Sequence, residues 1–580
     1  MSQLLSDDPS STPKISAQGV NWIDRLLCGF IAIGLLLKLH LVFLLSINWD
    51  EYHYLSYVYQ YLQGELSSPW QTFHVRLFSW LPAVPGYEIG QVFTARFILW
   101  FLGGVSTALT YAIGRRFLSR SGALFGALSY LSFSYLVEHS TSFRPDTLSV
   151  PLFLGAIYLV LSRSTLAAGM GAGVLLALSI MITIKSVLFL GLVGLIFLLR
   201  WPREKEKRPL LGQSLAWSAA FLVSLAALWA WHQSGLVPAE VSSSGGYLKR
   251  SASKVFLSHG FFPRLPYFLN SLWWDFVPWL LLFCGGLLTL RKAVAESGER
   301  RYRAWTLLAL SLPLTTLLLY RNAFPYYYVF ILSPAVLFCG VSLESLLKAS
   351  KAKGSWLLKV AAIVLVFAVG IQVGAQYLRH SWDQNGQQKV LNSTIHRMFP
   401  EPVPYIDRCS MVASFPKKGF FMSSWGMESY LESGKPILQE VVEEERPLFL
   451  IANVPSLWFF LSDEQADQMR YSLLPEDRQV LRNNFIQHWG WLFVAGKQLQ
   501  LDGIAWQQFE ILIPGPYTLE SPVAVEIDGH NVDPGGVLHL DVGLHQVKPP
   551  TEASAITLRW GDHIYRPEHR PIPQRLFRDF

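Results

Sequence analysis

Two adjacent carboxylates, Asp50 and Glu51, follow the first long apolar stretch of the sequence. A charged group beside a membrane-length apolar segment is costly, so it usually marks a function or a specific partner. An ionised carboxylate in that place can accept the proton of a reacting hydroxyl group, as a general base does. The alternative interpretation is that both acids are solvated loop residues that only end the helix.

A second polar segment, residues 138–146 (EHSTSFRPD), stands between two apolar runs. Proline suits the first turn of a helix, so Pro145 indicates that a helix begins there and that Arg144 and Asp146 lie at its outer end. The positive end of the helix dipole alone would explain Asp146, but a capping role does not require the arginine. We therefore treat His139, Arg144 and Asp146 as candidate contacts of an anionic ligand.

Further cations stand in the segments between apolar runs. Taken singly, each is better explained as a side chain whose charged end reaches the membrane interface. Gathered on one face they can hold a phosphate, for which arginine supplies a two-pronged donor and lysine a point charge. These candidates are His74, Arg76, Lys185, Lys249, Arg250, Lys254, Arg264 and Arg321.

Several common catalytic signatures are missing from the sequence. It contains no Walker loop, dinucleotide fingerprint, Cys/His metal cluster or serine-hydrolase elbow. Nucleotide-driven transport and zinc-dependent hydrolysis are therefore disfavoured. We predict no cofactor and no metal ligands; a divalent metal ion is compatible with the sequence but not indicated by it.

The elements that must position these residues are apolar helices. The chain has 580 residues with only 15% charged, and its mean hydropathy of +0.30 is high for a soluble protein of this length. A helix needs roughly 20 apolar residues to cross the hydrocarbon of a bilayer. By that criterion we predict about eleven spans, at residues 26–47, 91–114, 122–137, 148–161, 166–184, 187–199, 215–231, 272–290, 304–320, 327–341 and 357–375.

The basic residues between these runs predict the orientation. Alternate connections are rich in Lys and Arg, which is typical of cytoplasmic loops, whereas the intervening loops are longer and far less basic. This pattern places the N-terminus in the cytoplasm and, with an odd number of spans, the C-terminal part outside. The net charge of +7 therefore reflects topology, and we predict no nucleic-acid partner.

Composition divides the chain into four regions. We predict a cytoplasmic tail (1–24), a transmembrane domain (25–377), an extracytoplasmic α/β domain (378–497) and an extracytoplasmic β-sandwich (498–580). The last region has short alternating runs at 509–514, 523–527, 537–540 and 555–560, separated by turn residues. Two long exterior loops, 48–90 and 232–271, are predicted to lie at the membrane interface.

Four segments together resemble one family. They are the acids of segment 48–52, the stretch 94–97 (TARF) leading to 114–117 (GRRF), segment 143–148 (FRPDTL) and segment 321–328 (RNAFPYYY). In order and spacing they are similar to the protein O-mannosyltransferase and aminoarabinose-transferase superfamily of C-type (GT-C) glycosyltransferases. The resemblance covers the membrane region well and the exterior part poorly.

The resemblance implies an inverting transfer of a sugar from a polyprenyl-phosphate donor to an extracytoplasmic glycan, lipid or protein. Asp50 matches the catalytic aspartate of the family, which is the general base, and Glu51 matches its acidic neighbour. Tyr326, in the last of the similar segments, joins the candidate contacts of the donor. The first exterior loop departs from the family pattern: residues 74–82 read HVRLFSWLP where a Pro-Pro-Leu stretch is common.

The proposed chemistry agrees with the residues. A phosphate is a weakly basic leaving group, so the transfer does not need the acidic carboxyl that protonates the leaving oxygen in a glycosidase. One ionised acid and nearby cations suffice. The sugar carrier would reach the enzyme sideways from membrane lipid, and we expect location in a bacterial inner membrane.

Two other functions remain open from the sequence. A secondary transporter would place charged residues near the membrane midplane on broken helices, with two related halves. A non-catalytic receptor or scaffold would leave Asp50 and Arg144 in separate surroundings. The sequence shows no repeated half, and its candidate charges stand at the outer ends of the runs.

Overall fold

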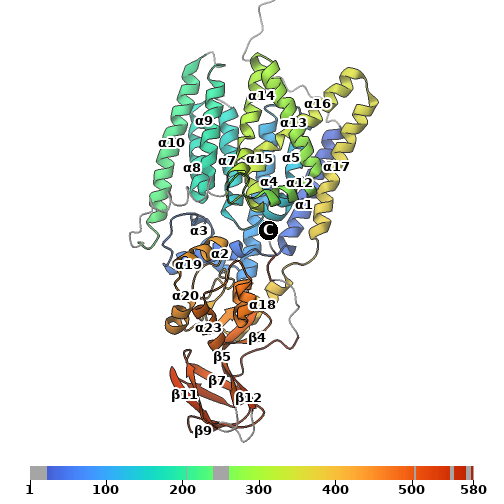
Figure 1. Cartoon of the computed structure of the whole chain (residues 1–580). Coiled ribbons are helices and arrows are strands. Elements are labelled where there is room, and N and C mark those ends of the chain that lie inside the picture. The colour runs from blue at the N-terminus through green and yellow to red at the C-terminus, as the bar shows by residue number, and fades with distance from the viewer. Residues whose placement is uncertain are drawn as a thin grey trace, which may run out of the picture.

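The computed structural model describes residues 22–162, 164–203, 206–238, 260–501, 505–548, 554–569 and 576–578. Long helices run side by side in one part, and smaller helices and sheets extend from one end of that bundle (Figure 1). Of the described helices, six are long and apolar enough to cross a membrane. They are α1 (Trp22–Leu44), α4 (Tyr87–Gly114), α7 (Pro145–Ser162), α10 (Lys207–Gln233), α13 (Phe276–Ala295) and α17 (Trp356–His380).

The expected number of about eleven spans is not confirmed. A pair bent by 43°, residues Pro325–Ala335 and Leu337–Lys353, makes a seventh if it counts as one span. Other apolar runs form shorter helices. Three of them have 13 residues, and a helix of that length covers only about 20 Å of the roughly 30 Å hydrocarbon layer. The shorter helices are α5 (Arg120–Ser132), α8 (Leu166–Ile182), α9 (Leu188–Arg200) and α14 (Gly298–Leu310), with α15 (Tyr328–Ala335) and α16 (Leu337–Lys353) forming the bent pair.

Local backbone breaks explain the shorter helices. The run predicted at 122–137 is divided because Phe133 has an extended backbone, with φ −69° and ψ 132°. Helix α5 therefore ends at Ser132, and a separate short helix, α6 (Ser134–His139), follows it. In the same way a 3-10 turn, η2 (Ile184–Val187), separates α8 from α9.

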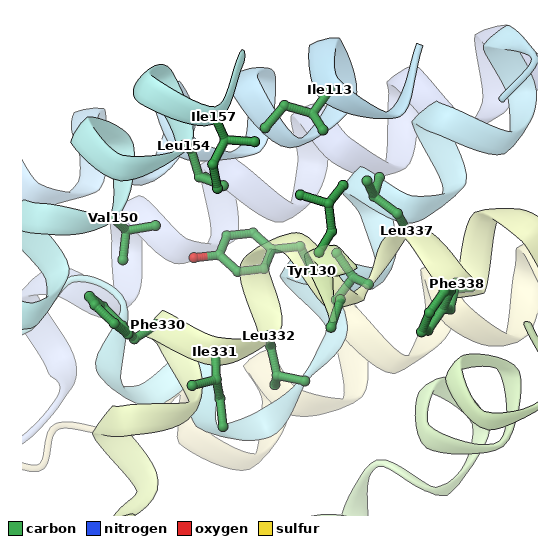
Figure 2. Packing of buried hydrophobic residues seen from close by; sticks show 14 of the residues in the cluster. Ile113, Tyr130, Val150, Leu154, Ile157, Phe330, Ile331, Leu332, Leu337 and Phe338 are labelled. Atoms are coloured by element: carbon green, nitrogen blue, oxygen red, sulfur yellow. The ribbon is translucent and has the colours of Figure 1, made fainter. Parts of the chain in front are cut away.

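The core of the bundle joins helices that are distant in sequence. Figure 2 shows Tyr130 of α5 between Val150 and Leu154 of α7 and the side chains Ile331 and Leu332 of α15. The hydroxyl of Tyr130 lies 3.3 Å from the backbone carbonyl oxygen of Val329, to which it donates a hydrogen bond. This core fixes the end of α7, where Arg144 and Asp146 are placed.

Helices α8 and α10 approach each other closely because α8 presents two glycines. A Cβ atom on Gly169 would collide with the carbonyl of Gln213, and one on Gly173 would collide with the carbonyl of Trp217. Glycines four residues apart on one helix face allow this kind of backbone contact between apolar helices.

Short helices lie between the helix bundle and the helices and sheets of the described residues from 386 to 578, which we call the exterior part because they stand outside the bundle. The predicted interfacial loop 48–90 contains α2, which lies beside α3 between the long helices and the sheets (Figure 1). Helix α2 comprises Trp49–Gln63 and α3 comprises Val75–Phe78. Other short elements in this half of the chain are η1 (Leu81–Ala83), α12 (Leu265–Trp274), η3 (Leu312–Leu318) and η4 (Pro325–Tyr327).

The exterior part combines helices with two sheets. Strands of the larger sheet run in the order β10-β7-β12-β5-β3-β1-β2, with β4 paired to β5, and the smaller sheet has the order β6-β11-β8-β9. The helical elements are α18 (Gly386–Met398), α19 (Ser424–Ser433), α20 (Ile437–Glu440), the π-turn η5 (Val441–Glu445), α21 (Pro455–Trp458), η6 (Phe459–Leu461), α22 (Asp463–Asp467) and α23 (Pro475–Asn484). The strands are β1 (Tyr405–Ile406), β2 (Lys417–Lys418), β3 (Phe449–Ile451), β4 (Phe485–Trp489), β5 (Leu492–Leu501), β6 (Gln507–Ile511), β7 (Gly515–Glu520), β8 (Val525–Ile527), β9 (His530–Val532), β10 (Val537–Leu540), β11 (Gly543–Lys548) and β12 (Ser554–Trp560).

Strand β5 crosses the predicted domain boundary at residue 497. Its first residues pair antiparallel with β3, and its last residues pair antiparallel with β12. Beyond it, the two sheets share one core that includes Phe509 and Ile511 of β6 and Leu519 of β7. This is the arrangement of a sandwich, in which each strand buries alternate side chains.

Buried polar contacts tie the exterior part to the bundle. The carboxylate of Glu88, in the first turn of α4, accepts hydrogen bonds from Asn392 (2.9 Å) and from the backbone N–H of Ser414 (3.0 Å), and it lies 2.9 Å from His396. At the end of α1, the side chain of Gln388 bonds both the N–H and the C=O of Ile47. Groups buried this way need their partners, so the two parts are held in one register.

Candidate active site

Helix α2 begins with a capping box that orients the two carboxylates. The Asn48 side chain accepts a hydrogen bond from the Asp50 N–H at 3.0 Å, and the Glu51 carboxylate accepts one from the Asn48 N–H at 3.0 Å. Asp50 therefore lies in the first helical turn, where the N-terminal end of the helix dipole favours a negative charge.

Glu51 forms a buried ion pair and is not a solvated acid. Its side chain has no exposed surface and lies 2.5 Å from the Arg96 guanidinium. It also accepts a hydrogen bond from the Phe143 N–H at 2.7 Å. Burial acts to raise the pKa of Glu51, but the charge and hydrogen bonds of Arg96 outweigh this and hold the pKa below its usual value. Glu51 thus fixes α2 against α4 and against the segment before α7.

We expect Glu51→Gln to destabilise the protein by about 3–5 kcal/mol, because Arg96 would lose its buried counter-charge. The measurement is the unfolding transition of the purified protein in detergent. The matched control is Glu299→Gln, which breaks exposed pairs with Arg203 and Arg303 and should cost less than about 1 kcal/mol. Equal effects of the two substitutions would contradict a structural role for Glu51.

Asp50 meets Arg144. The Asp50 carboxylate lies 2.5 Å from the guanidinium, and the Asp50 side chain is 17% exposed while that of Arg144 is 3% exposed. The guanidinium carbon stands 3.5 Å from the centroid of the Tyr326 ring. Burial acts to lower the pKa of Arg144, but Asp50 raises it above its usual value. The partly exposed carboxylate of Asp50 is therefore in contact with the guanidinium of Arg144, which always carries a positive charge.

A second acid-base pair stands beside the first. Lys185 lies 2.8 Å from the carboxylate of Asp146, and its ammonium is 4.8 Å from the centroid of the same Tyr326 ring. Asp146 is therefore engaged by a cation, in addition to its position in the first turn of α7. The two cations, Arg144 and Lys185, both contact the ring of Tyr326. We call the set Asp50, Arg144, Asp146, Lys185 and Tyr326 the Asp50 cluster.

His74 borders this cluster without joining its charges. Its ring is buried and lies edge-on to Tyr54 and to Phe143, and its Nε2 atom lies 2.9 Å from the Tyr54 carbonyl oxygen. Burial lowers the pKa of His74 to about 4. Near neutral pH the imidazole is therefore uncharged, so it packs beside Arg144 without repelling it.

The other predicted cations do not gather at Asp50. Arg76 donates to the Trp231 carbonyl at the end of α10 (2.7 Å). Arg321 pairs with Glu428 of the exterior part (2.7 Å), and Arg264 donates to the Arg321 carbonyl (2.9 Å). Both sets hold elements together. The candidates Lys249, Arg250 and Lys254 lie outside the described residues.

His139 faces a different space. It lies 3.7 Å from Glu138, and both line a polar cavity of about 410 Å³ that Asn48 and Glu51 also border. The segment predicted to bind an anion is therefore divided: Arg144 and Asp146 belong to the Asp50 cluster, and His139 belongs to this cavity.

Sequence reasoning missed the neighbours of Asp50 on its own helix. His53 stacks on Phe421 of the exterior part, with ring centroids 3.9 Å apart, and also contacts Tyr57. Burial lowers the pKa of His53 to about 4, so it is neutral near neutral pH. The spacing of Asp50, His53, Tyr54 and Tyr57 is i, i+3, i+4 and i+7, which is one helix face. That periodicity is the signal that would have identified them.

Within the part of the chain that the structure describes, no three His, Cys, Asp or Glu side chains are grouped as metal ligands.

Comparison with known families gives one match. Residues 85–231 match the model of the dolichyl-phosphate-mannose-protein mannosyltransferase family. That segment carries Arg96, Arg144, Asp146 and Lys185, but it begins after Asp50. No curated protein matches the sequence.

Solved structures resemble the chain over most of its length. The oligosaccharyltransferase of Archaeoglobus fulgidus in the apo form has a TM-score of 0.58 at 10% identity and covers 94% of this chain and 98% of its own. ArnT from Cupriavidus metallidurans bound to undecaprenyl phosphate has a TM-score of 0.52 at 13% identity, covering 73% of this chain and 92% of its own. The archaeal oligosaccharyltransferase AglB in complex with an inhibitory peptide and a dolichol-phosphate has a TM-score of 0.51 at 11% identity, covering 90% of this chain and 76% of its own. At these identities the likeness establishes the fold.

Proposed function

From the fold that this chain shares with C-type glycosyltransferases, we propose that it moves a sugar from a polyprenyl-phosphate donor to an extracytoplasmic acceptor with inversion, using Asp50 as general base. The observation that carries the proposal is the Asp50–Arg144 contact of 2.5 Å. A receptor or scaffold does not require a partly exposed carboxylate in contact with a buried arginine. Fold alone would not support an activity.

The reaction needs one proton acceptor. The acceptor hydroxyl attacks the anomeric carbon of the donor from the face opposite the phosphate, so one displacement inverts the configuration. As the new C–O bond forms, Asp50 takes the hydroxyl proton and the bond from the anomeric carbon to the phosphate oxygen breaks. The polyprenyl phosphate leaves with the electron pair, so the leaving oxygen needs no acid.

Arg144 and Lys185 supply the positive charge. Negative charge grows on the phosphate as it leaves, and preorganised cations lower the free energy of that transition state. The ring of Tyr326 holds both side chains in place. Because Arg144 also touches Asp50, the group that stabilises the leaving phosphate also orients the base.

A donor with a hydrocarbon tail explains the position of this chemistry. Helix α2, which carries Asp50, lies between the long helices and the exterior part (Figure 1), and Arg144 directly precedes the long helix α7. A polyprenyl chain can stay in lipid while its phosphate reaches the Asp50 cluster at the interface. We propose that the site faces away from the cytoplasm, as the distribution of basic loops indicates.

The direct test is donor consumption. Purified protein in lipid nanodiscs is incubated with a panel of polyprenyl-phosphate sugars and a mixed glycan, lipid and peptide acceptor pool. We expect at least one donor to release polyprenyl phosphate, which is detected by mass spectrometry. The same sugars on nucleoside diphosphates, which lack the lipid, should not be consumed. Consumption of nucleotide sugars, or of no donor, would contradict the proposal.

A further inference from the structure

The polar cavity on the other side of Glu51 is separate from the Asp50 cluster. Its volume of about 410 Å³ is within the range of small-ligand pockets. Ser134, Tyr135, Ser142, Asn270 and Gln384 contribute hydroxyl or amide groups to its wall. A wall of this kind suits the hydroxyl groups of a sugar rather than an apolar tail.

The charged side chains that line the cavity do not neutralise one another. Glu138 is already engaged, since it lies 2.9 Å from His380 and 3.7 Å from His139. Arg379 and Arg578 also line the cavity, and their guanidinium groups lie 3.9 Å from the indole rings of Trp274 and Trp382. Two carboxylates line the cavity, but Glu51 is already neutralised by Arg96. Arg379 and Arg578 therefore face Glu138 alone, which leaves excess positive charge.

The second arginine comes from the carboxy-terminal end of the chain. The backbone carbonyl of Leu576 accepts a hydrogen bond from Gln388 at 3.0 Å, and Phe577 packs edge-on to Trp49 and Tyr52 of α2. These contacts place Arg578 beside the helix that carries Asp50. Burial lowers the pKa of Arg578 from its usual value, which Glu138 opposes. Arg379 and Arg578 are both exposed side chains, so an anion that enters the cavity can reach their guanidinium groups.

We propose that this cavity binds the anionic group of a sugar-containing acceptor, a phosphate or a carboxylate, between Arg379 and Arg578. The inference rests on the proposed transferase function, because it names the acceptor of that reaction. The arginine fork recognises the anion, and the polar wall accommodates the sugar. Asn48 and Glu51 at the border belong to the start of α2, so an acceptor held there lies beside the first turn of the helix that carries Asp50.

The test uses the full chain in detergent with the Arg144→Gln substitution, which weakens phosphate binding at the Asp50 cluster. The probe is glucose 1-phosphate, with glucose and decyl phosphate as comparisons, measured by titration calorimetry. We expect glucose 1-phosphate to bind tightest. Adding Arg578→Gln should weaken it about 10- to 100-fold, the range for losing a charge-assisted hydrogen bond. Arg578→Lys should restore part of the loss.

The control is Arg397→Gln, which removes an exposed arginine that contacts Tyr565 and lines neither site. It should leave binding unchanged. If Arg578→Gln does not fold, Arg379→Gln replaces it, with the same expectation. Binding that is insensitive to both arginines would overturn the inference. A preference for decyl phosphate would also overturn it, because the cavity would then hold a lipid headgroup.

The two proposals fail separately. If the wild type consumes a polyprenyl-phosphate donor but Arg578 has no effect on glucose 1-phosphate binding, only the acceptor site is wrong. If binding depends on Arg578 but no donor is consumed, the cavity is a sugar-anion site and the transferase proposal is wrong.

Discussion

Replacing Asp50 by asparagine should lower the rate of sugar transfer about 100- to 10,000-fold, the usual contribution of a general base. The amide keeps the shape of the side chain but cannot take a proton. Arg144 would keep the Tyr326 ring as a contact and Asp146 nearby, so we expect the variant to fold. The measurement is the initial rate of polyprenyl-phosphate release, together with the unfolding temperature.

Two controls make the Asp50 result specific. Asp383→Asn removes an exposed carboxylate that lines neither site and should leave the rate unchanged. Asp50→Glu keeps a base but moves it by one methylene, so it should retain part of the rate. Near wild-type transfer by Asp50→Asn would remove Asp50 from the mechanism.

Replacing Arg144 by glutamine should lower kcat/KM for the donor about 100- to 1,000-fold, the effect of removing one preorganised group that stabilises transition-state charge. The glutamine keeps polar character but loses the charge and the fork. Arg144→Lys should fall between the two, since a lysine keeps only the charge. The measurement is the dependence of the initial rate on donor concentration.

The alternative for Arg144 is a purely structural role at the start of α7. It predicts a lowered unfolding temperature with unchanged donor dependence, and that result would contradict our assignment. Because Asp50 and Arg144 touch, the effects of their substitutions on the transfer rate should not be independent. The rate of the double variant should be close to that of the slower single variant, and higher than the rate expected from multiplying the two fold-losses.

Local patterns were sufficient to predict much of the fold. Apolar runs gave the positions of the long helices, and the alternating runs at 537–540 and 555–560 correspond to β10 and β12. The number of spans could not be obtained from composition, because a single extended residue, Phe133, divides an apolar run. Strand β5 shows a similar limit: β4 precedes it directly, but its other two partners, β3 and β12, are 41 or more residues away along the chain.

The candidate site was predictable where its residues are close to a helix end. Asp50, Arg144 and Asp146 were identified from such positions. The ion pair between Glu51 and Arg96 was not, because its partners are separated by 45 positions and only packing brings them together. For the same reason Arg76, Arg264 and Arg321 could not be distinguished from Lys185 before their contacts were known.

The stacking of His53 on Phe421 limits which parts of this protein can be exchanged with the corresponding parts of a homologue. One turn of helix separates that contact from Asp50, so the exterior part helps to set the position of the base. Grafting the exterior part of a relative onto this bundle would replace Phe421 while leaving α2 unchanged. The unit that can be exchanged between homologues is therefore α2 together with the exterior part, although they are separated in sequence by most of the bundle.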